Sequence, residues 1–175
     1  MKKCIFILSA IFLTILCGCS KWAGDPITEK ISIEGSYTEL FVEDAFDVYV
    51  CDTVDQIFIT AGENIMPKVV VKNSGNKLQI YLKGWTTNRG ANMKVILPYN
   101  SELRKVNLSG ASDFHSDYPL KAQKVEIFMS GASDFFGNIE AGDVDIDLSG
   151  SSDINGSITA TNLILDMSGS SDANI

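Results

Sequence analysis

Apolar and polar residues alternate along most of the chain after residue 31, which predicts β-strands with one buried and one exposed face. The clearest runs are "AFDVYVC" (45–51), "QIFITA" (56–61), "KLQIYL" (77–82) and "MKVILP" (93–98). "KVVVK" and "KLQIYL" flank "NSGN" (73–76), a turn sequence typical of a β-hairpin. No segment of this region keeps apolar residues at helical spacing for three turns, so we expect an all-β protein.

A repeat follows residue 100. "LSGASDF" at 108–114 recurs as "MSGASDF", "LSGSSDI" and "MSGSSDA", and its first serines are Ser109, Ser130, Ser149 and Ser168, spaced 21, 19 and 19 residues apart. A fixed period near twenty residues is typical of a solenoid. Strands separated by sharp corners at this period predict a right-handed parallel β-helix, because parallel connections are right-handed by strong preference. A left-handed hexapeptide helix is the alternative, but the 19-residue period does not preserve a six-residue phase.

The first nineteen residues differ in kind from the rest. A basic start, "MKK", precedes the apolar run "CIFILSAIFLTIL", which is too short for a confident membrane-spanning helix and is typical of a signal peptide. The run ends in "LCGC", which resembles the lipobox of bacterial lipoproteins, where cleavage precedes a cysteine that is then lipidated. The resemblance implies a signal peptide over 1–18, lipidation of Cys19 and a lipidated tether over 19–30. An ordinary secretory signal and an uncleaved anchor are the alternatives.

Cleavage there would change the charge and the cysteine count. The full chain has 14 Lys and Arg against 22 Asp and Glu, a net charge of −8, and loss of Lys2 and Lys3 would make it −10. Such an acidic chain is not expected to bind nucleic acid, which requires clustered lysine and arginine. Cys51 would be the only cysteine left inside the fold, and we expect a buried, unreactive thiol.

The lipobox, "AFDVYV", "ILP" and the repeated "SGASD" together resemble the auto-transporter adhesin head domain, also called the GIN domain. The resemblance covers about residues 31–175 and is most specific in the repeats. It implies a secreted or lipidated β-helical protein, anchored to the membrane through its N-terminal lipid, and we expect it in the bacterial cell envelope, at the outer membrane. We therefore expect one β-solenoid domain over 31–175, with irregular strands over 31–100 and four repeats over 101–175. The fourth repeat is incomplete, which predicts a truncated array that frays or associates end to end.

The motif itself has two interpretations. As a corner, its glycines supply positive φ angles, its first serines form a hydroxyl ladder between coils, and its aspartates accept hydrogen bonds from the turn. As a site, aspartates stacked about 5 Å apart would form carboxylate pairs suited to glycoside hydrolysis or to Ca²⁺. The residues at issue are Ser109, Asp113, Ser130, Asp134, Ser149, Asp153, Ser168 and Asp172.

We favour the corner, because acid and base need different environments and the four copies are alike. The sequence predicts a non-enzymatic binding or structural module with an unidentified glycan or protein ligand, no cofactor and no metal site. The alternative is a polysaccharide-acting β-helix enzyme. Trp85 and Arg89, in the polar segment "GWTTNRG", are candidates for ligand contact, and His115 is expected in a solvated loop inserted into the first repeat.

Overall fold

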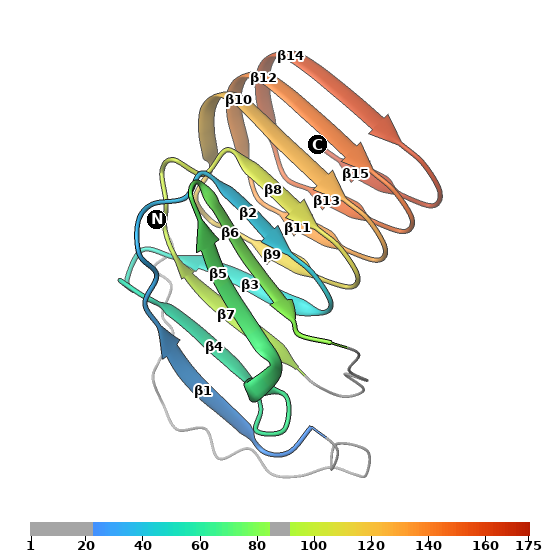
Figure 1. The fold of residues 1–175 in the computed structure, drawn as a ribbon. Helices are drawn as coiled ribbons and strands as arrows, with labels where there is room; N and C mark the ends of the chain where they lie inside the picture. Colours follow the sequence, from blue (N-terminus) through green and yellow to red (C-terminus); the bar gives the residue numbers. More distant parts are fainter. Residues whose placement is uncertain (1–22, 85–91) are drawn as a thin grey trace.

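Two β-sheets make up almost all of the computed structural model, which describes residues 23–84 and 92–175 (Figure 1). The only helical element within those residues is a 3₁₀ turn, η1 (Met66–Lys68). The prediction of an all-β protein is confirmed. None of the helices in the described part of the chain is long and apolar enough to cross a membrane.

The first sheet, which we call sheet A, has eight strands in the order β1-β4-β7-β3-β9-β11-β13-β15. Their bounds are Pro26–Ile31 for β1, Ile57–Gly62 for β4, Met93–Pro98 for β7, Phe46–Cys51 for β3, Asp113–His115 for β9, Asp134–Phe136 for β11, Asp153–Asn155 for β13 and Asp172–Asn174 for β15.

The second sheet, sheet B, has seven strands in the order β14-β12-β10-β8-β2-β6-β5. Their bounds are Ile158–Met167 for β14, Ile139–Leu148 for β12, Leu120–Met129 for β10, Lys105–Leu108 for β8, Glu39–Val42 for β2, Lys77–Leu82 for β6 and Val69–Ser74 for β5.

From β8 onward the chain alternates strictly between the sheets, so that each coil contributes one strand to sheet B and one to sheet A. Equivalent strands of successive coils pair in parallel at the repeat spacing: Ile127 faces Ile146, and Ile154 faces Ala173. The predicted strands and their stacking are confirmed. The right-handed sense of the coiling stays a prediction, and the antiparallel pairs β1–β4, β4–β7 and β5–β6 make both sheets mixed.

The space between the sheets is filled by the inward positions of the alternating strands. Phe114 and Phe135 are fully buried and stack with their ring centroids 5.1 Å apart. Because identical positions of neighbouring coils lie about 4.8 Å apart, like side chains form continuous buried columns. The last coil covers the interior less completely, since Leu163 and Met167 of β14, which occupy inward positions, are exposed. End-to-end association through this coil stays a prediction.

One boundary differs from the expectation. β1 begins at Pro26 and pairs with β4, so part of the expected tether is an edge strand of sheet A. Proline is compatible with this place because it is the first residue of an edge strand. The "NSGN" turn does join the antiparallel strands β5 and β6, with Gly75 at φ 66°. The predicted signal peptide and Cys19 lie outside the described residues.

Candidate functional site: the outer face of sheet A

The repeated motif forms the corner between a sheet B strand and the next sheet A strand. Gly110, Gly131, Gly150 and Gly169 have φ angles between 81° and 90°, which confirms their predicted left-handed conformation. A Cβ atom added to Gly131 would collide with the carbonyl oxygen of Gly110, and the same contact recurs at the next two glycines. Glycine is therefore required for two reasons: the backbone adopts a positive φ angle, and the preceding coil lies too close for a Cβ atom.

A fifth, divergent copy of this corner lies in the N-terminal half. The register pairs Val42 with Leu108 and Asp47 with Asp113, which places Asp44 at the position of the motif glycine. Asp44 adopts φ 75°, the positive φ angle of a non-glycine residue, and its Oδ2 accepts a hydrogen bond from the N–H of Leu82 at 2.7 Å. This side-chain hydrogen bond gives Asp44 a role that glycine, which has no side chain, could not fill.

The first serines of the last two motifs join neighbouring coils as expected, but through backbone carbonyls rather than from hydroxyl to hydroxyl. Ser149 Oγ donates to the carbonyl of Met129 at 3.1 Å, and Ser168 Oγ to that of Leu148 at 3.5 Å. A buried hydroxyl column, which was not predicted, is formed by the second serines of the motifs. Ser133 Oγ donates to the Ser130 carbonyl at 3.2 Å and accepts from the N–H of Ser112 at 3.4 Å. The members of the column are Ser112, Ser133 and Ser152, which are fully buried, and Ser171 of the last coil, which is partly exposed.

The motif aspartates point outward from sheet A in one line, which we call the carboxylate row. The strand registers place them side by side: Asp47, Asp113, Asp134, Asp153 and Asp172. Asp113 Oδ1 accepts from the N–H of Asp134 at 3.2 Å, so the bond joins successive coils rather than closing a turn as predicted. The same bond joins Asp153 to Asp172 at 3.1 Å. Each of these two carboxylates thus uses one oxygen for the fold and turns the other toward solvent.

A second line of outward side chains runs parallel to the carboxylate row, two residues further along each strand. We call it the apolar row; from β4 to β11 it contains Phe58, Ile96, Tyr49, His115 and Phe136. The rings of Tyr49 and His115 stack at 4.6 Å, and those of His115 and Phe136 at 4.7 Å. The expectation of a solvated loop for His115 is therefore wrong, because the residue belongs to β9 and its imidazole is held between two aromatic rings.

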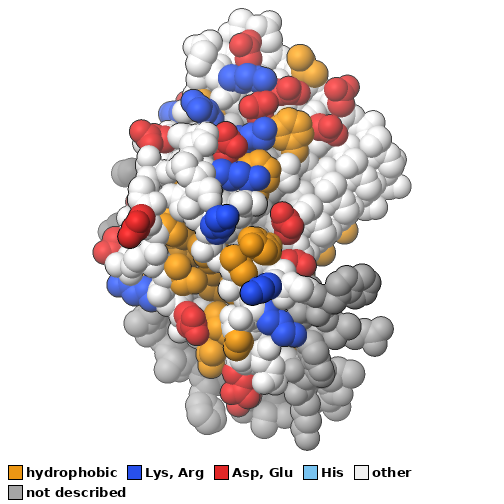
Figure 2. All heavy atoms as spheres, viewed as in Figure 1, with side chains coloured by type: hydrophobic (Ala, Val, Ile, Leu, Met, Phe, Trp, Pro, Cys, Tyr) orange, Lys and Arg blue, Asp and Glu red, His pale blue; other side chains and the backbone are white. Residues whose placement is uncertain are grey.

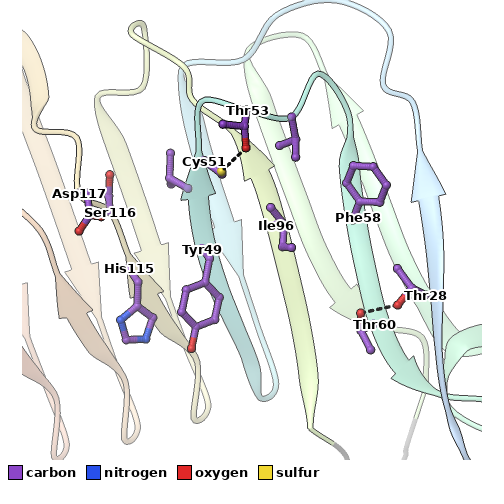
Figure 3. Close-up of a pocket in the computed structure, with 12 residues that line it drawn as sticks. Thr28, Tyr49, Cys51, Thr53, Phe58, Thr60, Ile96, His115, Ser116 and Asp117 are labelled. Atoms are coloured by element: carbon purple, nitrogen blue, oxygen red, sulfur yellow. Dashed lines mark hydrogen bonds between the residues drawn. The ribbon is translucent and has the colours of Figure 1, made fainter. Parts of the chain in front are cut away.

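A groove of about 610 Å³ lies over the start of the apolar row. Figure 3 shows its lining side chains in a line across five strands, from Asp117 beyond β9 to Thr28 on β1. Tyr49, Ile96 and Phe58 come from the central strands β3, β7 and β4. Five strands span four spacings of about 4.8 Å, which makes the groove about 19 Å long.

Four polar groups of the groove are bonded in two pairs. The hydroxyls of Thr28 and Thr60 lie 2.7 Å apart, and the Cys51 thiol lies 3.0 Å from the Thr53 hydroxyl (Figure 3). Cys51 is buried, as predicted. The groove therefore presents mainly carbon to a ligand, and Tyr49, His115 and Asp117 add polar groups to its lining.

The carboxylate row sets the electrostatics of this face. Burial raises the pKa of Asp113, and the neighbouring Asp134 and Asp47 raise it further. Burial also raises the pKa of Tyr49, to which the charges of Asp47 and Asp113 add. Tyr49 lines the groove, so the charges of Asp47 and Asp113 lie near it, as does the Lys94 ammonium, 4.2 Å from the Tyr49 ring centroid.

The remaining candidates are placed as follows. Trp85 and Arg89 lie outside the described residues. Across residues 23–84 and 92–175, no three His, Cys, Asp or Glu side chains are arranged to hold a metal ion. The apolar row was missed because its members lie between residues 49 and 136 and meet only through the sheet register, although the outward aromatics of "DVYV" and "DFF" were a visible signal.

The fold resembles those of proteins with solved structures. The chain resembles a putative adhesin from Parabacteroides distasonis with 21% sequence identity and a TM-score of 0.64, over 83% of this chain and 66% of that one. It resembles a putative lipid binding protein from the same species with 23% identity and a TM-score of 0.53, over 86% of this chain and 74% of that one. At these identities the likeness concerns the fold. No curated protein is detectably similar to the chain.

Residues 36–175 match the family described as "Putative auto-transporter adhesin, head GIN domain". This range includes both sheets apart from β1, all four repeats and the divergent corner at Asp44. The chain therefore belongs to the auto-transporter adhesin head GIN domain family.

Proposed function

We propose that this protein is a non-enzymatic binding module of the bacterial cell envelope and that the groove on sheet A is its binding site. The groove is the observation that carries the proposal, because it gathers aromatic and aliphatic side chains from five strands on the outside of the fold. Outward side chains of a sheet do not need to be apolar to stabilise the interior, and a concave apolar surface is the usual form of a ligand site. Membership of an adhesin-like family supports the same function.

The carboxylate row supports binding rather than catalysis. Glycoside hydrolysis needs two carboxyl groups with different tasks and different environments. Here the aspartates of successive coils share one backbone position, and two of them make the same hydrogen bond to the following coil.

We also propose that Cys19 is lipidated, that residues 1–18 are removed, and that the repeats form a right-handed β-helix. An anchor at Cys19 would hold the domain close to a membrane, because only a few residues separate this cysteine from β1. Acyl labelling of the full-length chain and of Cys19→Ser tests the anchor. Loss of the label and of membrane partitioning in the variant is expected, and an unchanged label contradicts lipidation.

The binding function is tested with cells that express the full-length chain. Protease treatment of intact cells establishes whether the domain reaches the surface, and adherence to a panel of immobilised proteins and glycans measures binding. Ile96→Asp, in the groove, is compared with Phe128→Asp, on the outer face of sheet B. We expect the groove variant alone to lose adherence. Equal adherence of both variants and the parent contradicts the proposed site, and release of new sugar ends from the glycans contradicts the non-enzymatic assignment.

A further inference from the structure

Opposite charges lie at the two ends of the groove. At the β1 end, Lys30 faces Phe58 in the register, and its ammonium lies 5.8 Å from the centroid of the Phe58 ring, which lines the groove. At the β9 end, Asp117 belongs to the lining, and Asp113 stands two residues before His115, another lining residue. The groove thus has a positive end on β1 and a negative end at β9, about 19 Å away across four strand spacings.

The charges between the two ends keep this order. Lys94 on β7 and Asp47 on β3 are direct neighbours in the register, and the Lys94 ammonium lies 4.2 Å from the centroid of the Tyr49 ring. These two opposite charges offset one another in the middle of the groove. The other carboxylates of the row, on β11, β13 and β15, lie beyond the β9 end and add to its negative charge. From β1 to β9, the charged residues beside the groove are Lys30, Lys94, Asp47 and Asp113.

The floor between the charged ends is mainly apolar. Phe58 and Ile96 lie on the central strands β4 and β7, and Val54 comes from the turn after β3 (Figure 3). The polar atoms of Tyr49 and His115 lie in the half of the groove nearer to β9. An alkyl chain can cover this floor without burying polar groups.

A peptide fits the floor less well than an alkyl chain does. Each residue of a peptide brings an N–H and a C=O group, and both need partners when they are buried. The central strands β4, β7 and β3 each pair with a neighbour on both sides, so their backbone groups are engaged within sheet A. The hydroxyls of Thr28 and Thr60 are bonded to one another as well.

We propose that the groove binds a linear zwitterion, in which an alkyl chain carries a carboxylate at one end and an ammonium group at the other; this inference rests on the proposed binding function of the same groove. The carboxylate contacts Lys30, and the ammonium group contacts Asp117 and Asp113. The alkyl chain lies over Phe58 and Ile96.

The length of the groove sets the length of the chain. An extended alkyl chain advances about 1.25 Å per carbon, because C–C bonds of about 1.5 Å meet at tetrahedral angles. A chain of about twelve carbons therefore spans about 15 Å. The remaining distance, about 4 Å in all, leaves room for contact with a charged side chain at each end.

Four ligands test the inference by calorimetric titration of the purified full-length protein, below the concentrations at which they form micelles. 12-Aminododecanoic acid has both charged ends, dodecanoic acid and dodecylamine each lack one, and 6-aminohexanoic acid has both ends on a chain too short to join them. Ile96→Lys, titrated under the same conditions, measures binding elsewhere. We expect 12-aminododecanoic acid to bind at least about fivefold more tightly than each of the other three.

Each comparison can overturn one part of the inference. Equal binding of dodecanoic acid overturns the contact between the ammonium group and the β9 end, and equal binding of dodecylamine overturns the contact between the carboxylate and Lys30. Equal binding of 6-aminohexanoic acid overturns the requirement that the chain spans the groove.

Matched variants locate the two ends of the ligand. Lys30→Met keeps an apolar stem and should remove the advantage of 12-aminododecanoic acid over dodecylamine. Asp113→Asn combined with Asp117→Asn should remove its advantage over dodecanoic acid. The controls lie on sheet B: Lys77→Met, whose ammonium also lies over a ring, and Asp147→Asn should leave binding unchanged. Thermal unfolding establishes that each variant is folded, and an unchanged preference in a folded Lys30→Met protein overturns the assignment of the ends.

The failure of this inference is distinguishable from failure of the proposed function. If none of the four ligands binds more tightly to the parent than to Ile96→Lys, but Ile96→Asp still removes adherence to a member of the panel, the ligand class is wrong and the binding site stands. If Ile96→Asp keeps adherence as well, the groove is not the site and both proposals are overturned.

Discussion

The outer faces of the two sheets are built on the same coils but carry opposite patterns of charge. On sheet B, lysines and carboxylates alternate and pair: Lys121 lies 2.8 Å from Glu140, and Lys124 lies 3.3 Å from Glu126 and 3.7 Å from Asp145. Figure 2 shows this mixture of positive and negative side chains on the face formed by β14, β12, β10, β8, β2, β6 and β5 in Figure 1. On sheet A, like charges stand beside one another.

The outward aromatic side chains lie beside lysines on both sheets and differ in their contacts with one another. On sheet B, the ammonium groups of Lys77 and Lys105 lie 3.4 and 4.7 Å from the ring centroids of Phe41 and Phe128. On sheet A, Lys94 and Lys30 lie 4.2 and 5.8 Å from the ring centroids of Tyr49 and Phe58. There Tyr49, His115 and Phe136 also stack on one another, and Tyr49 and His115 line a groove. Sheet B thus carries several paired charges, while sheet A combines an apolar groove with a line of like charges. This difference supports the proposed binding site on sheet A.

The largest expected effect is the difference in stability loss between a buried and an exposed phenylalanine of sheet A. Phe135 and Phe136 are adjacent on β11, but Phe135 is fully buried whereas Phe136 is 37% exposed. Phe135→Ala should destabilise the protein by about 3–5 kcal/mol, because it leaves a cavity in the column below Phe114. Phe136→Ala should cost about 1 kcal/mol or less, mainly through lost stacking on His115. Equal losses in chemical denaturation would mean that the apolar row is structural and would remove the contrast between the faces.

The next prediction tests whether the strands of both sheets depend on the same corner glycines for their stability. Gly131→Ala should destabilise by about 3 kcal/mol, from an unfavourable φ angle and a collision with the Gly110 carbonyl. Gly75→Ala is the matched control: its φ angle is also positive, but no atom lies within 4 Å of the added Cβ, so about 1 kcal/mol is expected. Hydrogen exchange should show protection lost from β10 and β11 together in Gly131→Ala. Loss from one sheet alone would contradict a shared scaffold.

A smaller effect concerns the pH dependence of the carboxylate row. The pKa of Asp113 is raised in the folded protein, chiefly by burial and then by Asp134 and Asp47. The folded state therefore binds the proton more strongly than the unfolded state, so stability falls as pH rises from the ordinary aspartate range through the raised pKa. Asp113→Asn should flatten this part of the profile by less than about 1 kcal/mol, since the group is largely solvated.

The control for that experiment is Asp147→Asn, which removes one negative charge from sheet B. Melting temperatures measured across the acidic range give the slope for each protein. A parent whose stability rises with pH over this window, relative to Asp113→Asn, would contradict the raised pKa and the repulsion within the row.

The smallest expected effect on stability concerns an ion pair on the outer face of sheet B. Lys121→Ala and Glu140→Ala, separately and together, should leave the melting temperature nearly unchanged, because both side chains are about half exposed and such pairs are screened by water. A double-mutant cycle measures the coupling directly. A large coupling would mean that the paired charges of sheet B stabilise the coils, and that their pairing has a purpose beyond neutralising the face.

The repeats could be predicted from sequence because each position has a fixed backbone role. Alternation predicted the strands, and the recurring glycines predicted the left-handed corners. The divergent copy at 42–49 could not be recognised, because Glu43, Asp44 and Phe46 replace the first serine, the glycine and the second serine, and a long insertion separates it from the next copy. The groove was missed for a related reason: β1, β4, β7, β3 and β9 become neighbours only through pairings that no local pattern encodes.

The buried serine column has a consequence for how such a protein can change its length. Within the column every coil offers the next one the same surface, with Ser133 receiving the N–H of Ser112 just as Ser171 receives that of Ser152. Duplication of a whole coil inside this region therefore creates no new kind of contact. The column ends where Phe46 takes the serine position and offers only its backbone N–H to Ser112 Oγ at 3.3 Å. A coil added within the repeats would thus lengthen the carboxylate row and leave the coil that carries Tyr49 unchanged.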